Sequence, residues 1–191
     1  MTANLSRRKF LSRAAAAIAA PYIIPSSALG LDGAVAPSER IVVGCVGIRG
    51  RGLHDLRWMI GNPDVQVVAI CDLQKAQREG VKGFIDQHYG NTDCAMYSDL
   101  REFLPSRPDI DAVLIATGDR WHAQAAVRAM REGKDVFSEK PSCMTITEGR
   151  AVVETAQRFG RVYQTGTQRL SEANHVFAIE MARTGRLGKV D

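Results

Sequence analysis

Short apolar runs alternate with longer segments of helical character from residue 41 onward in this 191-residue chain. The first run, 41–47, is apolar almost throughout, as expected of a strand that is covered on both faces. Such alternation is typical of successive β-α-β units, in which each helix returns the chain to lay the next strand parallel to the last. We therefore expect an α/β fold with a doubly wound parallel sheet.

The expected elements follow from the apolar runs and from the Gly, Pro and Asn residues that end them. Strands are expected at 41–47, 65–71, 95–97, 110–116, 136–138 and 162–165. Helices are expected at 53–60, 73–88, 99–104, 121–132, 151–159 and 174–183. Ser98 is expected to cap the third helix, whereas Thr145 and Glu148 match the capping-box pattern S/T-x-x-E before the fifth.

The first thirty residues have the pattern of an export signal, with basic residues before a short apolar run. The basic residues are Arg7, Arg8, Lys9 and Arg13. The apolar run at 14–20 is too short to span a bilayer, and the stretch 6–11 resembles the twin-arginine signal of proteins that are exported folded. We therefore expect a signal peptide at 1–30, a linker at 31–40, a periplasmic location and no stable membrane anchor after processing.

Charge and cysteine spacing argue against two other classes of protein. Four of the 25 basic residues lie in the signal, which leaves 21 to balance the 21 acidic residues, so the net charge of +4 is no indication of nucleic-acid binding. The cysteines form no C-x-x-C pair, and a zinc knuckle is therefore not expected. We expect no metal site. The four cysteines, which we expect to be free thiols, are Cys45, Cys71, Cys94 and Cys143.

A glycine-rich turn follows the first strand and leads directly into a helix. It consists of Gly47, Ile48, Arg49, Gly50, Arg51 and Gly52. In a doubly wound sheet, a turn at this place holds a pyrophosphate against the N-terminus of the helix. Arg49 replaces the second glycine of G-x-G-x-x-G, the one that lets the backbone approach the phosphates; we expect Gly50 to restore the room and Arg49 or Arg51 to add a charged contact. The alternative is a glycine-rich turn that binds nothing.

Asp72 ends the second expected strand, 20 residues after Gly52. An acidic side chain at this position accepts hydrogen bonds from the ribose hydroxyls of adenosine. Its charge would repel a 2′-phosphate, and so it favours NAD over NADP as the cofactor. In the alternative interpretation, Asp72 only caps the following helix.

Three further motifs occur in the order and spacing of one family. They are Ala116-Thr117-Gly118-Asp119-Arg120-Trp121-His122-Ala123, Glu139-Lys140-Pro141 and Gly166-Thr167-Gln168-Arg169. From about residue 40 onward the chain resembles the glucose-fructose oxidoreductase and inositol dehydrogenase family (Gfo/Idh/MocA), and its signal resembles that of the secreted twin-arginine branch. The resemblance implies a Rossmann domain that binds NAD(P), here 41–170, followed by a second α/β domain that begins at 171–191 and is otherwise missing.

The resemblance also implies roles for single residues. Lys140 is the expected catalytic residue, because its family counterpart lies beside the nicotinamide and the substrate hydroxyl, where an ammonium stabilises developing negative charge. Without the resemblance, Glu139 and Lys140 are simply a surface ion pair. For His122 we favour a structural role in orienting its loop over direct contact with the ligand. The full expected cofactor-binding set is Gly47, Ile48, Arg49, Gly50, Gly52, Asp72, Thr117, His122, Glu139, Lys140 and Gln168.

The expected reaction of the whole enzyme is hydride transfer between NAD(P) and a hydroxyl of a sugar or cyclitol. The alternatives are NAD-dependent hydrolysis of a glycoside by transient oxidation, and a non-catalytic nucleotide-binding remnant. The family's second domain supplies an Asp and a His for proton transfer, and so we expect the 191-residue form to show little or no turnover, whether it is a fragment or the natural product. The expected partners are a sugar-like small molecule and the twin-arginine export machinery, with homo-oligomers only for the full-length form.

Overall fold

The computed structural model describes residues 26–31 and 35–188, and the chain divides into two units, 1–39 and 40–191. In the first unit the described residues form two short 3-10 helices, η1 (Ser26–Leu29) and η2 (Pro37–Glu39). The expected export signal falls mostly on 1–25, outside the described residues. Within the part that is described, no helix combines the length and apolar character needed to cross a membrane.

The second unit is built on a six-stranded sheet in which all neighbouring strands run parallel. The strands are β1 (Ile41–Val46), β2 (Val65–Cys71), β3 (Ala95–Tyr97), β4 (Ala112–Ile115), β5 (Asp135–Glu139) and β6 (Tyr163–Gly166). Their order is β3-β2-β1-β4-β5-β6, so the chain reaches one edge with β3 and then returns to pair β4 with β1. This reversal defines a doubly wound sheet. The fold class and the six strands predicted from the sequence are confirmed.

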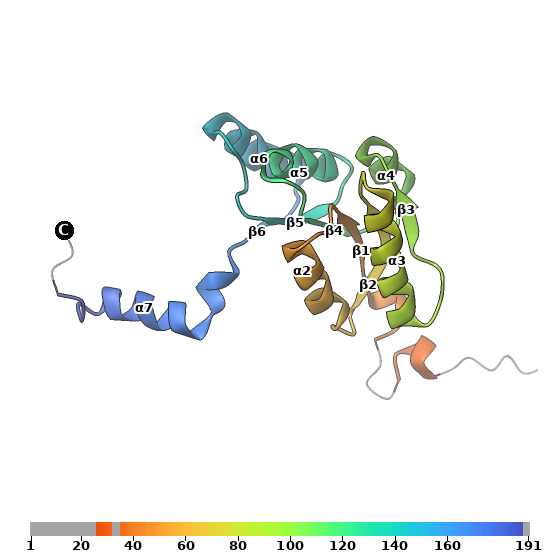
Figure 1. Cartoon of the computed structure of the whole chain (residues 1–191), viewed down its shortest axis with the longest axis horizontal. Coiled ribbons are helices and arrows are strands. Elements are labelled where there is room, and N and C mark those ends of the chain that lie inside the picture. The colour runs from red at the N-terminus through yellow and green to blue at the C-terminus, as the bar shows by residue number, and fades with distance from the viewer. Residues whose placement is uncertain (1–25, 32–34, 189–191) are drawn as a thin grey trace, which may run out of the picture. The chain divides into compact units, whose positions relative to one another are not determined.

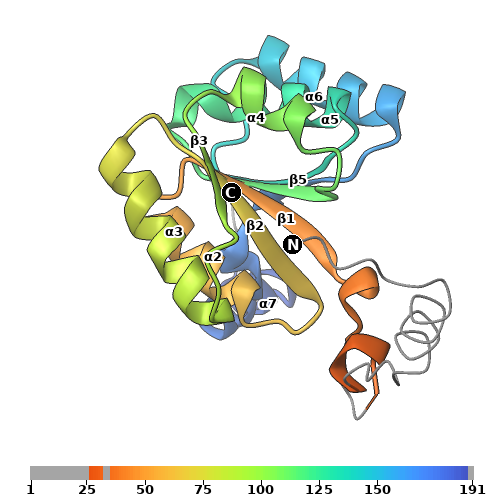
Figure 2. The ribbon, with the colours of Figure 1, turned by 90° about the vertical axis from the view of Figure 1, so that its right-hand side faces the viewer.

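Helices cover both faces of the sheet (Figures 1 and 2). They are α2 (Arg51–Ile60), α3 (Lys75–Tyr89), α4 (Leu100–Ser106), α5 (His122–Arg131) and α6 (Ile146–Phe159), and a further helix, α7 (Ala173–Arg183), follows the last strand. One face carries α2 and α3, and the other carries α4, α5 and α6. Alternate strand residues supply two cores, since Val113 and Ile115 pack on the second face whereas Leu114 packs on the first.

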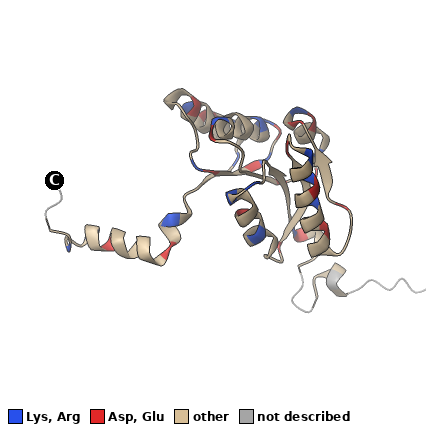
Figure 3. Ribbon diagram, in the orientation of Figure 1, with Lys and Arg blue, Asp and Glu red and all other residues tan. Residues whose placement is uncertain are grey.

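The outer helix surfaces mix both signs of charge (Figure 3). On α3, Lys75 lies 3.7 Å from Glu79 and Lys82 lies 2.8 Å from Asp86, both as i,i+4 pairs. Such pairing is typical of a solvated helix face. These pairs agree with the balanced charge expected for the body of the chain.

Helix caps account for two differences from the expected elements. The capping box of Thr145 and Glu148 is confirmed, and α6 begins directly after it, five residues before the expected start. Ser98 was the wrong choice of cap for α4. The residue immediately before α4 is Asp99, whose carboxylate accepts the Arg101 N–H at 2.8 Å. The other element ends differ from the expected ones by one or two residues.

Beyond β6 the chain forms a 3-10 helix, η4 (Gln168–Ser171), and then α7. The structure describes every residue of α7, and none of them is buried. Its apolar side chains include Phe177, which is 60% exposed. The two cores therefore draw their residues from the segments before α7.

Candidate nucleotide-binding site

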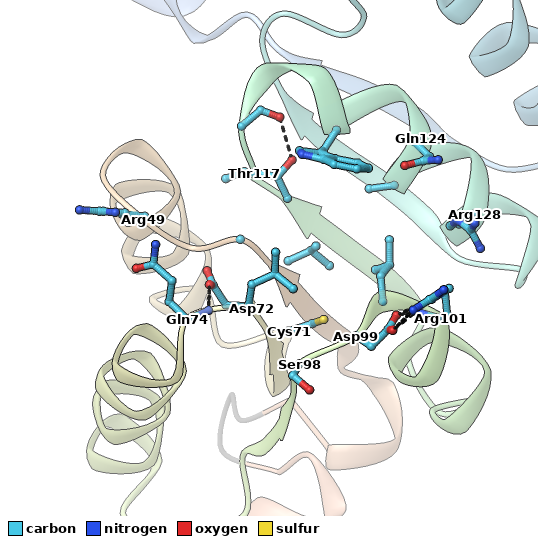
Figure 4. Close-up of a pocket in the computed structure, with 18 of the residues that line it drawn as sticks. Arg49, Cys71, Asp72, Gln74, Ser98, Asp99, Arg101, Thr117, Gln124 and Arg128 are labelled. Atoms are coloured by element: carbon cyan, nitrogen blue, oxygen red, sulfur yellow. Dashed lines mark hydrogen bonds and ion pairs between the residues drawn. The ribbon is translucent and has the colours of Figure 1, made fainter.

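A cleft of about 920 Å³ lies where the carboxyl ends of the strands meet (Figure 4). Its walls come mainly from the loops after β1, β2, β3 and β4 and from the adjoining turns of α4 and α5. Open α/β sheets bind ligands at this edge, at the point where the winding reverses. The cleft is also in the size range of small-molecule sites. Five of the expected cofactor-binding residues line it: Gly47, Arg49, Gly50, Asp72 and Thr117.

Each of the three glycines in the first loop is required for a different structural reason. Gly47 has a φ of +68°, and a β-carbon there would lie 2.6 Å from Thr117 Cγ2. A β-carbon on Gly52 would lie 2.5 Å from the β-carbon of Ala116, so this glycine lets α2 pack closely on the end of β4. Gly50 has a φ of +52° and open space around it, and no side chain caps the N-terminus of α2. The backbone at the start of α2 is therefore bare where it faces the cleft.

The two arginines of this loop point to different places. Arg49 lines the cleft, and Figure 4 shows its side chain directed outward, away from Asp72. Arg51 instead pairs with Asp55 at 2.9 Å and does not line the cleft. Ile48 is fully buried in the core under α2 and α3, so its side chain has a packing role.

Asp72 lies at the end of β2 with its carboxyl group in the cleft (Figure 4). One oxygen, Oδ1, accepts the Gln74 N–H at 2.8 Å and closes a turn before α3. The N-cap of α3 is Gln74, so Asp72 is not the helix cap that the alternative interpretation required. Carboxylates have spare acceptor capacity after one such bond, and Asp72 is therefore able to accept from a ligand hydroxyl.

Two apolar side chains line the cleft that the sequence analysis did not assign to the site. Leu73, directly after Asp72, is 86% exposed, and Trp121, in the 3-10 helix η3 (Asp119–Trp121), is 54% exposed. Large apolar side chains in a cleft with a few polar groups are typical of sites for flat organic ligands. Their position in the sequence could have indicated this role, because Leu73 and Trp121 both follow the carboxyl end of a strand.

The far end of the cleft is polar and contains a tight ion pair. Both oxygens of Asp99 accept hydrogen bonds from the Arg101 guanidinium, at 3.0 and 2.5 Å (Figure 4). These hydrogen bonds lower the pKa of Asp99 to about 2. Gln124 and Arg128 of α5 complete this end. The residues come from a β-α loop and two helices that no local motif connects, and so the sequence analysis missed them.

Glu139, Lys140 and Gln168 lie together at the ends of β5 and β6, outside the residues that line the cleft. The Gln168 side-chain amide donates to Glu139 Oε1 at 2.8 Å, and the Lys140 backbone N–H donates to Glu139 Oε2 at 3.1 Å. The Glu139 side chain is buried whereas Lys140 is exposed. Glu139 pairs with Arg51 at 3.4 Å, which contradicts the alternative that Glu139 and Lys140 form a surface ion pair.

The buried side chain of His122 links the loop after β4 with the loop after β5. Its ring is 1% exposed, with Nδ1 2.7 Å from the Pro141 carbonyl oxygen and Nε2 3.0 Å from that of Thr117. Both contacts are to backbone acceptors, and the ring does not line the cleft. The geometry gives His122 an orienting role between the loops after β4 and β5.

The cysteines are free thiols, and three of them, Cys45, Cys71 and Cys94, are buried. Cys71 lines the cleft, but burial raises its pKa to about 12, and a thiol in this state is a poor nucleophile at neutral pH. Among residues 26–31 and 35–188, no three His, Cys, Asp or Glu side chains gather in a group that could hold a metal ion.

The family match decides the class of protein. Residues 40–167 match the oxidoreductase family with an NAD-binding Rossmann fold. The chain belongs to this oxidoreductase family. The matched range includes the glycine loop, Asp72, Lys140 and β6. The Gfo/Idh/MocA family predicted from the sequence is confirmed, and with it an NAD-binding Rossmann domain.

Curated relatives match over nearly the whole length of this chain. A glycosyl hydrolase family 109 protein of Shewanella baltica (strain OS155) is 31% identical over 209 aligned residues, which cover 98% of this chain and 44% of the relative. An alpha-N-acetylgalactosaminidase of Shewanella oneidensis is 30% identical, again over 98% of this chain and 44% of the relative. The chain thus spans less than half the length of these relatives.

Solved structures share the fold of this chain. A myo-inositol 2-dehydrogenase from Lactobacillus plantarum has a TM-score of 0.68 at 22% identity, covering 79% of this chain and 43% of that one. A scyllo-inositol dehydrogenase from Lactobacillus casei, solved with NAD(H) and scyllo-inositol, has a TM-score of 0.67 at 22% identity, covering 78% and 43%. A putative myo-inositol dehydrogenase from Sinorhizobium meliloti 1021 is 26% identical, with a TM-score of 0.63 and coverage of 79% and 43%.

Proposed function

We propose that this chain binds NAD in the cleft and forms the nucleotide-binding part of an enzyme that transfers hydride to or from a hydroxyl of a sugar or cyclitol. The observation that carries the proposal is that the bare backbone at Gly50 and the carboxylate of Asp72 line the same cleft. A helix N-terminus attracts the pyrophosphate, and an acid at the end of the next strand accepts from the adenosine ribose. Both groups line one cleft in a chain of the NAD-binding family.

The residues of the cleft fit the parts of a dinucleotide in order. Gly47 and Gly50 would face the pyrophosphate, and Asp72 the adenosine ribose. Leu73 and Trp121 would cover the adenine with their exposed apolar surface. A 2′-phosphate would have to lie beside the Asp72 carboxylate, and like charges at such a distance repel. NAD is therefore proposed as the preferred cofactor over NADP.

Lys140 is the proposed catalytic residue. Its side chain is exposed at the carboxyl end of β5, the strand that pairs with β4, and β4 in turn is followed by Thr117 in the cleft wall. The cofactor, when bound, supplies the hydride acceptor or donor. The Lys140 ammonium would hydrogen-bond the substrate oxygen and stabilise the negative charge that develops on it. Glu139 and Gln168 would hold the loop from which Lys140 projects.

The curated relatives favour a second candidate reaction, the hydrolysis of a glycoside. They carry the names of glycosidases and align with 98% of this chain. In such a reaction the hydride would be taken up and later returned, so that the cofactor ends unchanged. Product analysis separates the two. A ketosugar formed with reduced cofactor supports net oxidation, whereas a released sugar with unchanged cofactor supports hydrolysis.

Fluorescence tests the cofactor proposal directly, because the chain has two tryptophans and one of them lines the cleft. Trp58→Phe removes the background of the other, which is 72% exposed on α2. Titration of this variant with NAD⁺ is expected to quench Trp121, with weaker binding of NADP⁺. The matched variant Trp121→Phe should lose the signal. Absence of NAD⁺ binding by calorimetry at millimolar concentration would refute the proposal.

We also propose that the protein is exported by the twin-arginine route. The support is the basic and apolar pattern of 6–20. NAD is a cytoplasmic compound, so a protein that crosses the membrane folded would carry its cofactor with it. Replacement of Arg7 and Arg8 by Lys is expected to leave the protein in the cytoplasmic fraction. Unchanged fractionation of that variant would count against this route.

A further inference from the structure

A polar cluster built around two buried carboxyl groups lies between α2, the end of β5 and η4. It consists of Arg51, Asp55, Glu139 and Gln168. Arg51 Nη2 lies 2.9 Å from Asp55 Oδ1, and Arg51 Nε lies 3.4 Å from Glu139 Oε1. One guanidinium thus contacts both carboxyl groups. The cluster connects the helix that begins at the glycine loop with the strand that precedes Lys140.

The charges of this cluster do not balance if both acids are ionised. Asp55 is 6% exposed and Glu139 is 4% exposed, and a single guanidinium faces the two. Gln168, which contacts Glu139 from η4, is neutral. His54 lies at 4.0 Å from Asp55 but is 71% exposed, and so it does not add a buried positive charge. Two buried carboxylates that share one site hold a proton between them more strongly than a single acid does.

One oxygen of Asp55 identifies where the proton resides. Within the described residues, Asp55 Oδ2 is buried and has no hydrogen-bond partner, whereas Oδ1 faces Arg51. A buried carboxylate oxygen without a donor is costly, but the same oxygen bearing a hydrogen becomes a donor itself. On Glu139, Oε1 and Oε2 both already accept hydrogen bonds, from Gln168 and from the Lys140 N–H. Neither oxygen of Glu139 is therefore left without a donor.

We propose that Asp55 and Glu139 share one proton, held on Asp55, and that this pair positions Lys140 for the nicotinamide half of the cofactor. The second part rests on the proposed function. Glu139 Oε2 accepts the backbone N–H of Lys140, so whatever fixes the Glu139 carboxylate also fixes the start of the lysine's loop. Gly166 supports the same arrangement, since a β-carbon there would lie 2.8 Å from Glu139 Oε1.

The electrostatics of Asp55 agree with this assignment. Burial raises the pKa of Asp55, and the neighbouring Glu139 carboxyl group raises it further, while the charge of Arg51 acts in the opposite direction. An acid with a raised pKa in the folded state binds more protons than it does in the unfolded chain. Stability from this source is present at low pH and is lost as pH rises from the ordinary aspartate pKa through the raised one.

The first experiment needs no ligand. Asp55→Asn replaces the protonated acid with an amide that keeps one acceptor toward Arg51 and one donor toward Glu139. Asp55→Ala removes both. The expected result is a Tm for Asp55→Asn close to that of the 191-residue chain and a clearly lower Tm for Asp55→Ala. A carbon-13 carboxyl signal that disappears in Asp55→Asn should titrate above about 3.9, the ordinary value.

Asp86→Asn is the matched control. The Asp86 carboxylate lies 2.8 Å from Lys82 Nζ and its side chain is 14% exposed. An amide cannot replace its charge, so the control should lower the Tm. If Asp55→Asn instead lowers the Tm as much as Asp55→Ala, or if the assigned signal titrates at the ordinary value, then Asp55 is an ionised partner of Arg51 and the shared proton is wrong.

The second experiment separates the positioning role from cofactor binding in general. NAD⁺ and ADP-ribose differ by the nicotinamide, so the ratio of their affinities reports on that half of the site. Asp55→Ala is expected to weaken NAD⁺ binding about tenfold, as for the loss of one buried charged hydrogen bond, with ADP-ribose binding nearly unchanged. Asp55→Asn should preserve the ratio. An unchanged ratio in Asp55→Ala would overturn the positioning role.

The outcomes also distinguish this inference from the proposed function. A wild-type chain that binds neither NAD⁺ nor ADP-ribose would refute the proposed cofactor and, with it, the positioning role. The ligand-free Tm comparison and the carboxyl titration would still decide whether Asp55 and Glu139 share a proton.

Discussion

Gly52→Ala tests the closest approach in the site, that between α2 and the end of β4. The added β-carbon would lie 2.5 Å from the β-carbon of Ala116. Carbon atoms pack at about 3.5–4.0 Å, so α2 would have to retreat by roughly 1 Å. Overpacking of this kind costs about 1–3 kcal/mol, and the better helix propensity of alanine offsets at most about 1 kcal/mol. We expect a net loss of about 1–2 kcal/mol in the free energy of unfolding.

The same displacement should weaken cofactor binding, because α2 carries the bare backbone N-terminus into the cleft. Urea unfolding measures the stability change, and titration with NAD⁺ measures the second effect. Gly80→Ala on α3 is the matched control. A β-carbon there meets no atom within 4 Å, so this variant should gain about 0.5–1 kcal/mol from helix propensity alone.

A compensating change makes the reasoning refutable. Ala116→Gly removes the atom that the new methyl group meets, and the double variant should recover most of the lost stability and affinity. If Gly52→Ala proved as stable as the parent, the close approach of α2 to β4 would not be the reason for a glycine at this position. Failure of Ala116→Gly to rescue the variant would equally contradict the steric explanation.

Three further predictions follow from single side chains. Asp72→Asn should weaken NAD⁺ binding about tenfold and reduce the preference for NAD⁺ over NADP⁺, as measured by calorimetry; an unchanged preference would remove Asp72 from the ribose site. Arg101→Gln should raise the pKa of Asp99 from about 2 toward its ordinary value, because the hydrogen bonds from the guanidinium are lost. In the parent the ion pair should persist until the pH falls through about 2, and carboxyl NMR can follow both titrations. Cys71 should resist iodoacetamide at pH 8 in the folded chain because burial raises its pKa to about 12, with the half-buried Cys143 alkylated first in a mass-spectrometric time course; early labelling of Cys71 would contradict its burial.

The sequence predicted the features that depend on neighbouring residues. Apolar runs located all six strands because a strand covered on both faces has few polar positions. The spacing from Gly52 to Asp72 located one wall of the cleft, since a single β-α-β unit joins them. The capping box at Thr145 was recognised for the same reason, because its two partners are three residues apart.

Features that depend on separate segments meeting in space were not predicted. Arg49 or Arg51 was expected near a phosphate, yet Arg51 lies against Asp55 and Glu139, and only the folded chain brings Glu139 within its reach. The cap of α4 differed for a local reason. Ser98 and Asp99 are both good caps, and the choice depends on where α4 begins, which is one residue later than expected.

The ring of His122 has a consequence for anyone who redesigns this protein. Because its two nitrogens contact the carbonyl oxygens of Thr117 and Pro141, the loops after β4 and β5 are linked through a single buried side chain. A substitution chosen to alter one loop will therefore shift the other. Libraries that aim to change specificity should vary the two loops together and leave the histidine in place.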